Sequence, residues 1–168
     1  MYRELALFPP LLEKACKAAC ALCCHLKVEV MKPEMDIIMD FLSTFLENKL
    51  PEITTRLNAI EHRTKTLDSD NYAAKMIHCP YLGKDNTCDI YEARPYHCRQ
   101  HHSLILTDCE ISYRRYMKGK KKQTPFQMVT LEREMFMEAM TIFVGYLRRN
   151  KLPEKHSDLV ALSKEMLL

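Results

Sequence analysis

Residues 79–98 read CPYLGKDNTCDIYEARPYHC, and they interrupt a chain whose pattern is otherwise helical almost throughout. Two prolines, one glycine and a run of Asp, Asn and Thr punctuate this stretch. Residues of these types favour turns over regular elements. We therefore predict loops between Cys79 and Ser103, with one short turn of helix near residues 91–94.

Helices are predicted on both sides of this insert. Prolines suited to a first helical turn, and apolar residues at intervals of three or four, support the assignment. The capping-box spacings of Thr107 with Glu110 and of Thr124 with Gln127 mark two helix starts. The expected helices span residues 10 to about 24, 33–48, 51 to about 63, 72–77, 107–119, 125–150 and 157–166.

These elements predict a mainly α fold, a helical bundle with an irregular Cys-rich metal-binding loop insert. Its core is expected on the apolar helical faces, which carry Ile38, Phe41, Leu42, Phe45, Leu46, Ile53, Leu57 and Ile60. The chain of 168 residues suits one domain, 1–168. Within it we place a cysteine region at about 16–109 and C-terminal helices at about 107–168.

Eight cysteines fall into two groups. The first is Cys16, Cys20, Cys23 and Cys24, and the second is Cys79, Cys88, Cys98 and Cys109. On a helix, positions 16, 20 and 23 would share one stripe. Such clustering favours a multi-thiolate metal site, although buried free cysteines would show the same helical spacing. Disulfides are the alternative if the protein is secreted.

The spacing leaves the metal open between an iron–sulfur cluster and zinc. Only Cys20 and Cys23 form the C-x2-C pair typical of zinc sites. Cys79-Pro80 matches the Cys-Pro of bacterial ferredoxin sequences and favours iron–sulfur chemistry. The ligands expected first are Cys20, Cys23, Cys24, Cys79, Cys88 and Cys98, followed by Cys16 and Cys109.

The insert resembles a known family. Cys79-Pro-Tyr-Leu, followed by Cys88-Asp-Ile-Tyr-Glu-Ala-Arg-Pro-Tyr-His-Cys98-Arg, is similar to the pattern of the YkgJ-type cysteine-cluster family. The upstream group ending in Cys23-Cys24 resembles the CxxCxxxxCC signature of that family, with different spacing between its first cysteines. The resemblance covers about residues 16–109 and implies bound zinc or iron. Longer relatives include flagellin lysine methylases.

Composition excludes several function classes. Three isolated glycines leave no G-x-G-x-x-G or P-loop sequence, so the two commonest nucleotide-binding loops are absent. The formal charge of +3 is too small to indicate nucleic acid, and one four-thiolate zinc site would lower it to +1. No secretory signal or membrane-spanning run is visible, so we expect a cytoplasmic protein without a membrane partner.

Other polar residues near the insert have supporting roles in this interpretation. Arg94 and Arg99 flank the loop cysteines and would stabilise a negatively charged centre. The basic run at residues 114–122 is interpreted as a solvated helix end. Histidines beside the cysteines, including His25, His97 and His101, are expected on the surface or hydrogen-bonded near the site more often than as ligands.

Metal binding is thus the expected function, and three roles for the metal remain open. In the first role the metal would close the fold. In the second, the protein would be a redox or methyl-transfer enzyme that uses the cluster or reactive thiols. The third role is a structural metal in a non-enzymatic interaction module with a protein partner.

Overall fold

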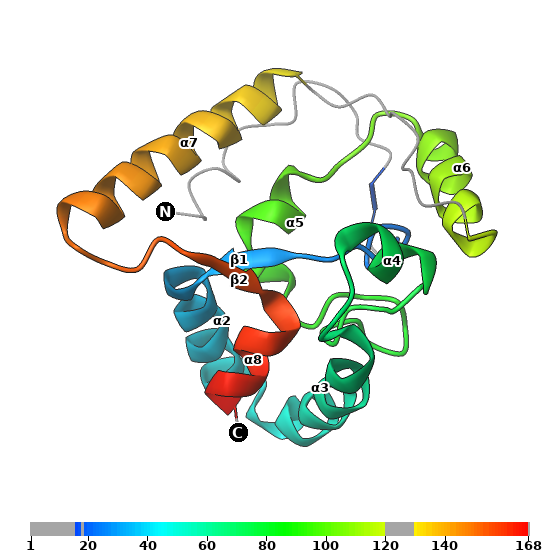
Figure 1. Cartoon of the computed structure of the whole chain (residues 1–168), viewed down its shortest axis with the longest axis horizontal. Coiled ribbons are helices and arrows are strands. Elements are labelled where there is room, and N and C mark those ends of the chain that lie inside the picture. The colour runs from blue at the N-terminus through cyan, green and yellow to red at the C-terminus, as the bar shows by residue number, and fades with distance from the viewer. Residues whose placement is uncertain (1–15, 18, 120–129, 168) are drawn as a thin grey trace.

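The computed structural model describes residues 16–17, 19–119 and 130–167 (Figure 1). Helices dominate it, which confirms the mainly α prediction. The α-helices are α2 (Lys32–Phe45), α3 (Leu50–Thr64), α4 (Ser69–Ala74), α5 (Tyr96–Gln100), α6 (Leu106–Met117), α7 (Thr130–Arg149) and α8 (Leu159–Leu167). Two 3-10 turns, η1 (Glu47–Lys49) and η2 (Tyr91–Ala93), and two strands, β1 (Glu29–Met31) and β2 (His156–Asp158), complete the described elements.

The main core lies where α2, α3 and α8 pack together, at the lower end of the molecule in Figure 1. Each helix contributes apolar residues at helical spacing, such as Ile38 and Leu42 from α2 and Ile53 and Leu57 from α3. These side chains are fully buried, as their period predicts. Phe45 differs, because its position at the last turn of α2 leaves it 68% exposed.

A two-stranded antiparallel sheet joins the ends of the described chain. Val30 of β1 pairs with Ser157 of β2, and the strands lie side by side at the centre of Figure 1. The sequence does not predict these strands, because three residues are too few to show an alternating pattern. The sheet brings the segment just after the first cysteines against the start of α8.

The predicted N-terminal helix is wrong over its described part. Residues 16–17 and 19–24 form turns with hydrogen bonds of the i to i+3 type, such as the Cys24 N–H to the Ala21 carbonyl at 3.0 Å. Ala19 has a φ of 60°, a left-handed conformation that a right-handed helix does not accommodate. The Cys24 carbonyl accepts a hydrogen bond from the Cys79 N–H, which joins these turns to the insert. Residues 10–15 of this prediction lie outside the described residues.

Other helix boundaries shift for local reasons. α4 begins before residue 72, because Asp68 accepts a hydrogen bond from the Asn71 N–H at 2.7 Å and caps the helix. α6 begins after Ile105 without a side-chain cap, so the capping box predicted at Thr107 is wrong. α5 interrupts the predicted loop. The start predicted for the next helix, at residues 124–127, lies outside the described residues.

α7 packs mainly on α5 through the start of its described length. The Tyr96 and Phe136 rings meet edge to face at 5.9 Å between centroids. Leu147 is buried, whereas Ile142 and Tyr146 are exposed. No described helix combines the length and apolar character needed to cross a bilayer.

Candidate metal centre

The eight cysteines are free thiols, and seven of them form two neighbouring sets. We call Cys23, Cys79, Cys88 and Cys98 the inner group, and Cys16, Cys20 and Cys109 the outer group. Cys24 lies beside Cys23 and shares a side-chain hydrogen bond with it. Cys16 is exposed, and the other cysteines are partly buried.

Backbone hydrogen bonds bring the inner group together from two distant parts of the chain. The Cys79 N–H donates to the Cys24 carbonyl at 2.6 Å, which joins the N-terminal turns to the insert. Within the insert, Leu82 and Cys88 form an isolated antiparallel bridge, and the Asp89 N–H donates to the Tyr81 carbonyl at 2.8 Å. Cys79 and Cys88, on the two sides of this tight reversal, both pack against the main core.

Cys98 reaches the inner group from the first turn of α5. Pro95 precedes that helix, and its carbonyl accepts the Cys98 N–H at 3.0 Å. A proline at this position sets φ near its helical value and suits a helix start.

The four inner thiols interact electrostatically with one another. Burial, followed by the charges of Cys23 and Cys88, raises the pKa of the Cys98 thiol to about 12. Burial raises the pKa of Cys79 well above its usual range, and the charges of Cys98, Cys88 and Cys23 act in the same direction. Four thiolates in this position would repel each other unless a cation neutralised them. This donor set fits a metal centre.

Burial is also the main cause of the raised pKa of Cys88. The hydrogen bond with Cys24 is the main cause for Cys23, ahead of burial. Arg94 opposes the shift at Cys23, Cys88 and Cys98. Its guanidinium stacks on the Tyr91 ring at 3.7 Å and its Nε donates to the Tyr91 carbonyl, so a positive charge is held beside the inner group.

Arg99 hydrogen-bonds to two backbone carbonyls of the insert. Its Nε donates to the Arg94 carbonyl at 2.7 Å, and another of its nitrogens donates to the Glu92 carbonyl. These bonds hold the η2–α5 corner in one shape. Arg99 thus holds the backbone beside Cys98, and the charge of Arg94 acts on three of the inner thiols.

Among the described residues, no three His, Cys, Asp or Glu side chains are arranged to hold a single metal ion. Zinc with four thiolates at about 2.3 Å requires the sulfurs to converge on one point. Ligands of an iron–sulfur cluster attach to different iron atoms, so their sulfurs lie farther apart.

Glu34 is a site-supporting residue that sequence reasoning missed. Its carboxylate is 3% exposed, and it accepts hydrogen bonds from the Met31 N–H at 3.0 Å and the Tyr96 N–H at 2.8 Å. It thereby fastens the end of β1 to the start of α5, the helix that carries Cys98. The only sequence signal for this role is that Glu34 is the third residue of α2, where a carboxylate can accept from the N–H of the residue before the helix.

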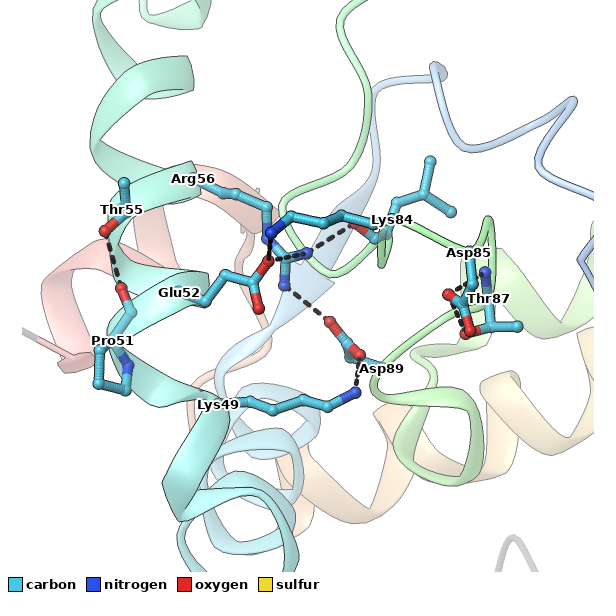
Figure 2. Close-up of polar contacts among 10 residues, drawn as sticks. Lys49, Pro51, Glu52, Thr55, Arg56, Lys84, Asp85, Thr87 and Asp89 are labelled. Atoms are coloured by element: carbon cyan, nitrogen blue, oxygen red, sulfur yellow. Dashed lines mark hydrogen bonds and ion pairs between the residues drawn. The ribbon is translucent and has the colours of Figure 1, made fainter.

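Asp89 and Tyr81 hold the insert against the helices. The Asp89 carboxylate is nearly buried and accepts from Lys49 Nζ at 2.6 Å and Arg56 Nη2 at 2.7 Å (Figure 2). The Tyr81 hydroxyl donates to Ser163 Oγ of α8 at 2.7 Å. Asp89 directly follows Cys88, and Tyr81 is two residues after Cys79, so these bonds set the positions of the two cysteines.

The outer group lines a separate cavity of about 30 Å³. Cys16, Cys20 and Cys109 lie here with Cys23, which borders both groups. Cys20, one of the ligands expected first, thus lies with Cys23 around this cavity, whereas Cys79, Cys88 and Cys98 do not line it. The Ser103 N–H donates to Cys16 Sγ at 3.4 Å. Burial raises the pKa of Cys109, and a hydrogen bond from Ser103 opposes this.

His25 lies in the same cavity, between the rings of Tyr113 and Tyr116 at 5.2 and 5.3 Å. Burial lowers its pKa to about 4, so the imidazole is neutral at pH 7. Among the described residues, neither ring nitrogen has a hydrogen-bond partner of normal geometry. His97 lies elsewhere, with Nδ1 2.7 Å from the Glu29 carbonyl oxygen.

The basic run begins at the exposed end of α6. Arg114, Arg115 and Lys118 are exposed there, as the interpretation of a solvated helix end predicts. The lysines at positions 120–122 lie outside the described residues.

Comparison with known proteins bears on the cysteine pattern. The family model CxxCxxCC, described as "Putative zinc- or iron-chelating domain", matches residues 15–125. No curated protein and no solved structure matches the chain. The matched segment includes all eight cysteines and covers well over half of the chain. The protein therefore belongs to the CxxCxxCC family of zinc- or iron-chelating domains.

Proposed function

We propose that Cys23, Cys79, Cys88 and Cys98 bind one metal centre, and that this centre is an iron–sulfur cluster rather than a zinc ion. The observation that supports the ligand set is the mutual electrostatic coupling of these four thiols, which come from segments more than 50 residues apart. Four thiolates are the usual ligand number for both centres.

Two features favour the cluster. Cys79-Pro80 matches the Cys-Pro of bacterial ferredoxin sequences, whose cysteines hold iron–sulfur clusters. Arg94 adds positive charge beside three of the four thiols, and nearby charge is one of the factors that set a cluster's potential. When bound, the cluster would supply one-electron chemistry and join the N-terminal turns to the insert.

Anaerobic purification with metal, sulfide and optical analysis tests this proposal. We expect a brown protein that absorbs near about 400 nm and contains iron and acid-labile sulfide. Colourless protein with one equivalent of zinc would contradict the cluster and keep the thiolate site. Protein without either metal, carrying eight reactive thiols, would contradict the whole proposal.

Replacing Arg94 by Gln is expected to weaken metal binding by about 10- to 100-fold, the usual cost of losing an outer partner of the ligands. The guanidinium lowers the pKa of Cys23, Cys88 and Cys98, so its loss makes their deprotonation harder. Competition with a chelator measures the affinity. Arg94→Lys should keep part of it, and an unchanged affinity in Arg94→Gln would refute a role for this charge.

Metal binding is expected to release about four protons at pH 7, one from each inner thiol. The raised pKa values, about 12 for Cys98, mean that the thiols are protonated in the metal-free chain. Metal binding must therefore strengthen as the pH rises toward these pKa values. Calorimetric titration with Zn²⁺ in buffers of different ionisation enthalpy gives the proton number, and a value near zero would contradict it.

A further inference from the structure

A second cavity, of about 710 Å³, lies between α3 and the insert. Its size is within the range of small-molecule sites. One wall is a single face of α3, and the other is formed by residues 76–79, 82–84 and 86. Cys79 is among the lining residues, so this cleft lies beside a residue of the inner group.

The lining changes in character along the cleft. Ala59, Ile60, Ile77 and Leu82 form an apolar middle. Charged side chains lie on either side of it, since Arg56 and Arg63 are seven residues apart on α3, or about 10 Å along the helix axis. A ligand that fits here needs an apolar body.

The charges in the lining favour an anion. Arg56, Arg63 and Lys84 are cationic, and Glu52 is the one lining carboxylate. Glu52 lies 3.5 Å from Lys84 and 4.0 Å from Arg56, so it is shared between two cations (Figure 2). Among the described side chains that line the cleft, three cations face one carboxylate, and Asp89, which lies outside the lining, pairs with Arg56.

Arg56 is held in place by hydrogen bonds from two of its three side-chain nitrogens. Its Nη1 donates to the Leu82 carbonyl at 2.8 Å and its Nη2 to Asp89 at 2.7 Å (Figure 2). Its Nε is buried and has no hydrogen-bond partner among the described residues. A buried donor on a charged group is costly to leave unpaired, so an acceptor oxygen is expected near it.

We infer that the cleft between α3 and residues 76–86 binds a small organic anion, with an apolar body on Ala59, Ile77 and Leu82 and an acidic group at Arg56 and Lys84. The body would contact Cys79, which would place the ligand directly beside the metal centre. The inference goes beyond the proposed function, and the binding itself does not require the metal.

Fluorescence titration of the full chain with 1-anilinonaphthalene-8-sulfonate, an anion with an aromatic body, tests this. We expect saturable binding to one site. Ala59→Trp, which fills the cleft from an exposed helix position, should abolish it, whereas Asn58→Trp, on the same helix but outside the lining, should not. Unsaturable binding, or equal affinity in the two variants, would overturn the cleft assignment.

The acidic group is tested by charge. Lys84→Glu is expected to weaken dye binding about tenfold, because a favourable contact becomes a repulsive one. Lys32→Glu is the matched control, since Lys32 likewise loses one exposed ion pair and lies outside the cleft. Octanoate or octyl phosphate should displace the dye, and the stronger competitor identifies the head group. Equal displacement by neutral octanamide would overturn the anion assignment.

Discussion

Replacement of Cys98 by serine is expected to lower metal affinity by more than about 100-fold, whereas replacement of Cys20 by serine should leave it unchanged. Loss of a group that only hydrogen-bonds to a metal ligand weakens metal binding about 10- to 100-fold, so loss of a thiolate ligand itself should weaken it more. Cys98 is coupled to Cys23 and Cys88, while Cys20 lies with the outer group around the smaller cavity. Metal content after anaerobic purification, and affinity by chelator competition, measure the difference.

The same substitution should destabilise the fold. Metal-binding free energy becomes folding free energy when the ligands come from separate segments, and structural zinc sites contribute about 10–16 kcal/mol in small peptides. We expect the thermal midpoint of Cys98→Ser to fall to that of the metal-free wild type. Cys20→Ser serves as the control with equal loss of one thiol. Loss of metal in Cys20→Ser but not in Cys98→Ser would replace our ligand set with one centred on the N-terminal turns.

Replacing Glu34 by alanine is expected to cost about 3–5 kcal/mol of unfolding free energy. The change leaves the N–H groups of Met31 and Tyr96 buried without an acceptor, at about 1–3 kcal/mol each, and empties the space of a buried side chain. Urea unfolding of the metal-free chain measures this cost without a contribution from the metal.

Glu34 also positions a proposed ligand, so a second readout is expected to change. Because Tyr96 begins the helix that carries Cys98, Glu34→Ala should weaken metal binding as well as stability. Asp36→Ala, on the same helix with a single exposed ion pair to Lys32, is the control, and such pairs contribute about 0–1 kcal/mol. A cost below about 1 kcal/mol for Glu34→Ala would contradict its role as a buried tie.

Helices α2 and α3 were predictable because their information is local. Each begins near a proline and repeats apolar residues at helical spacing, and the burial of Ile38, Leu42, Ile53 and Leu57 follows from that period. The strands were not predictable, because β1 and β2 are three residues long and exist only through their pairing across the chain. The predicted N-terminal helix is wrong because Ala19 has a left-handed φ of 60°, which an alanine in the sequence does not signal.

The candidate metal site, like the fold, was predictable from the sequence only in part. Cysteine is a soft ligand whatever its surroundings, so the number and spacing of the thiols were enough to indicate metal binding, in agreement with the family. Which thiols face one another depends on contacts between residues far apart in the sequence. Only the tertiary structure places Cys20 with Cys16 and Cys109 around the smaller cavity, and only it shows Glu34 and Asp89 as buried ties, because burial and pairing over such separations leave no local pattern in the sequence.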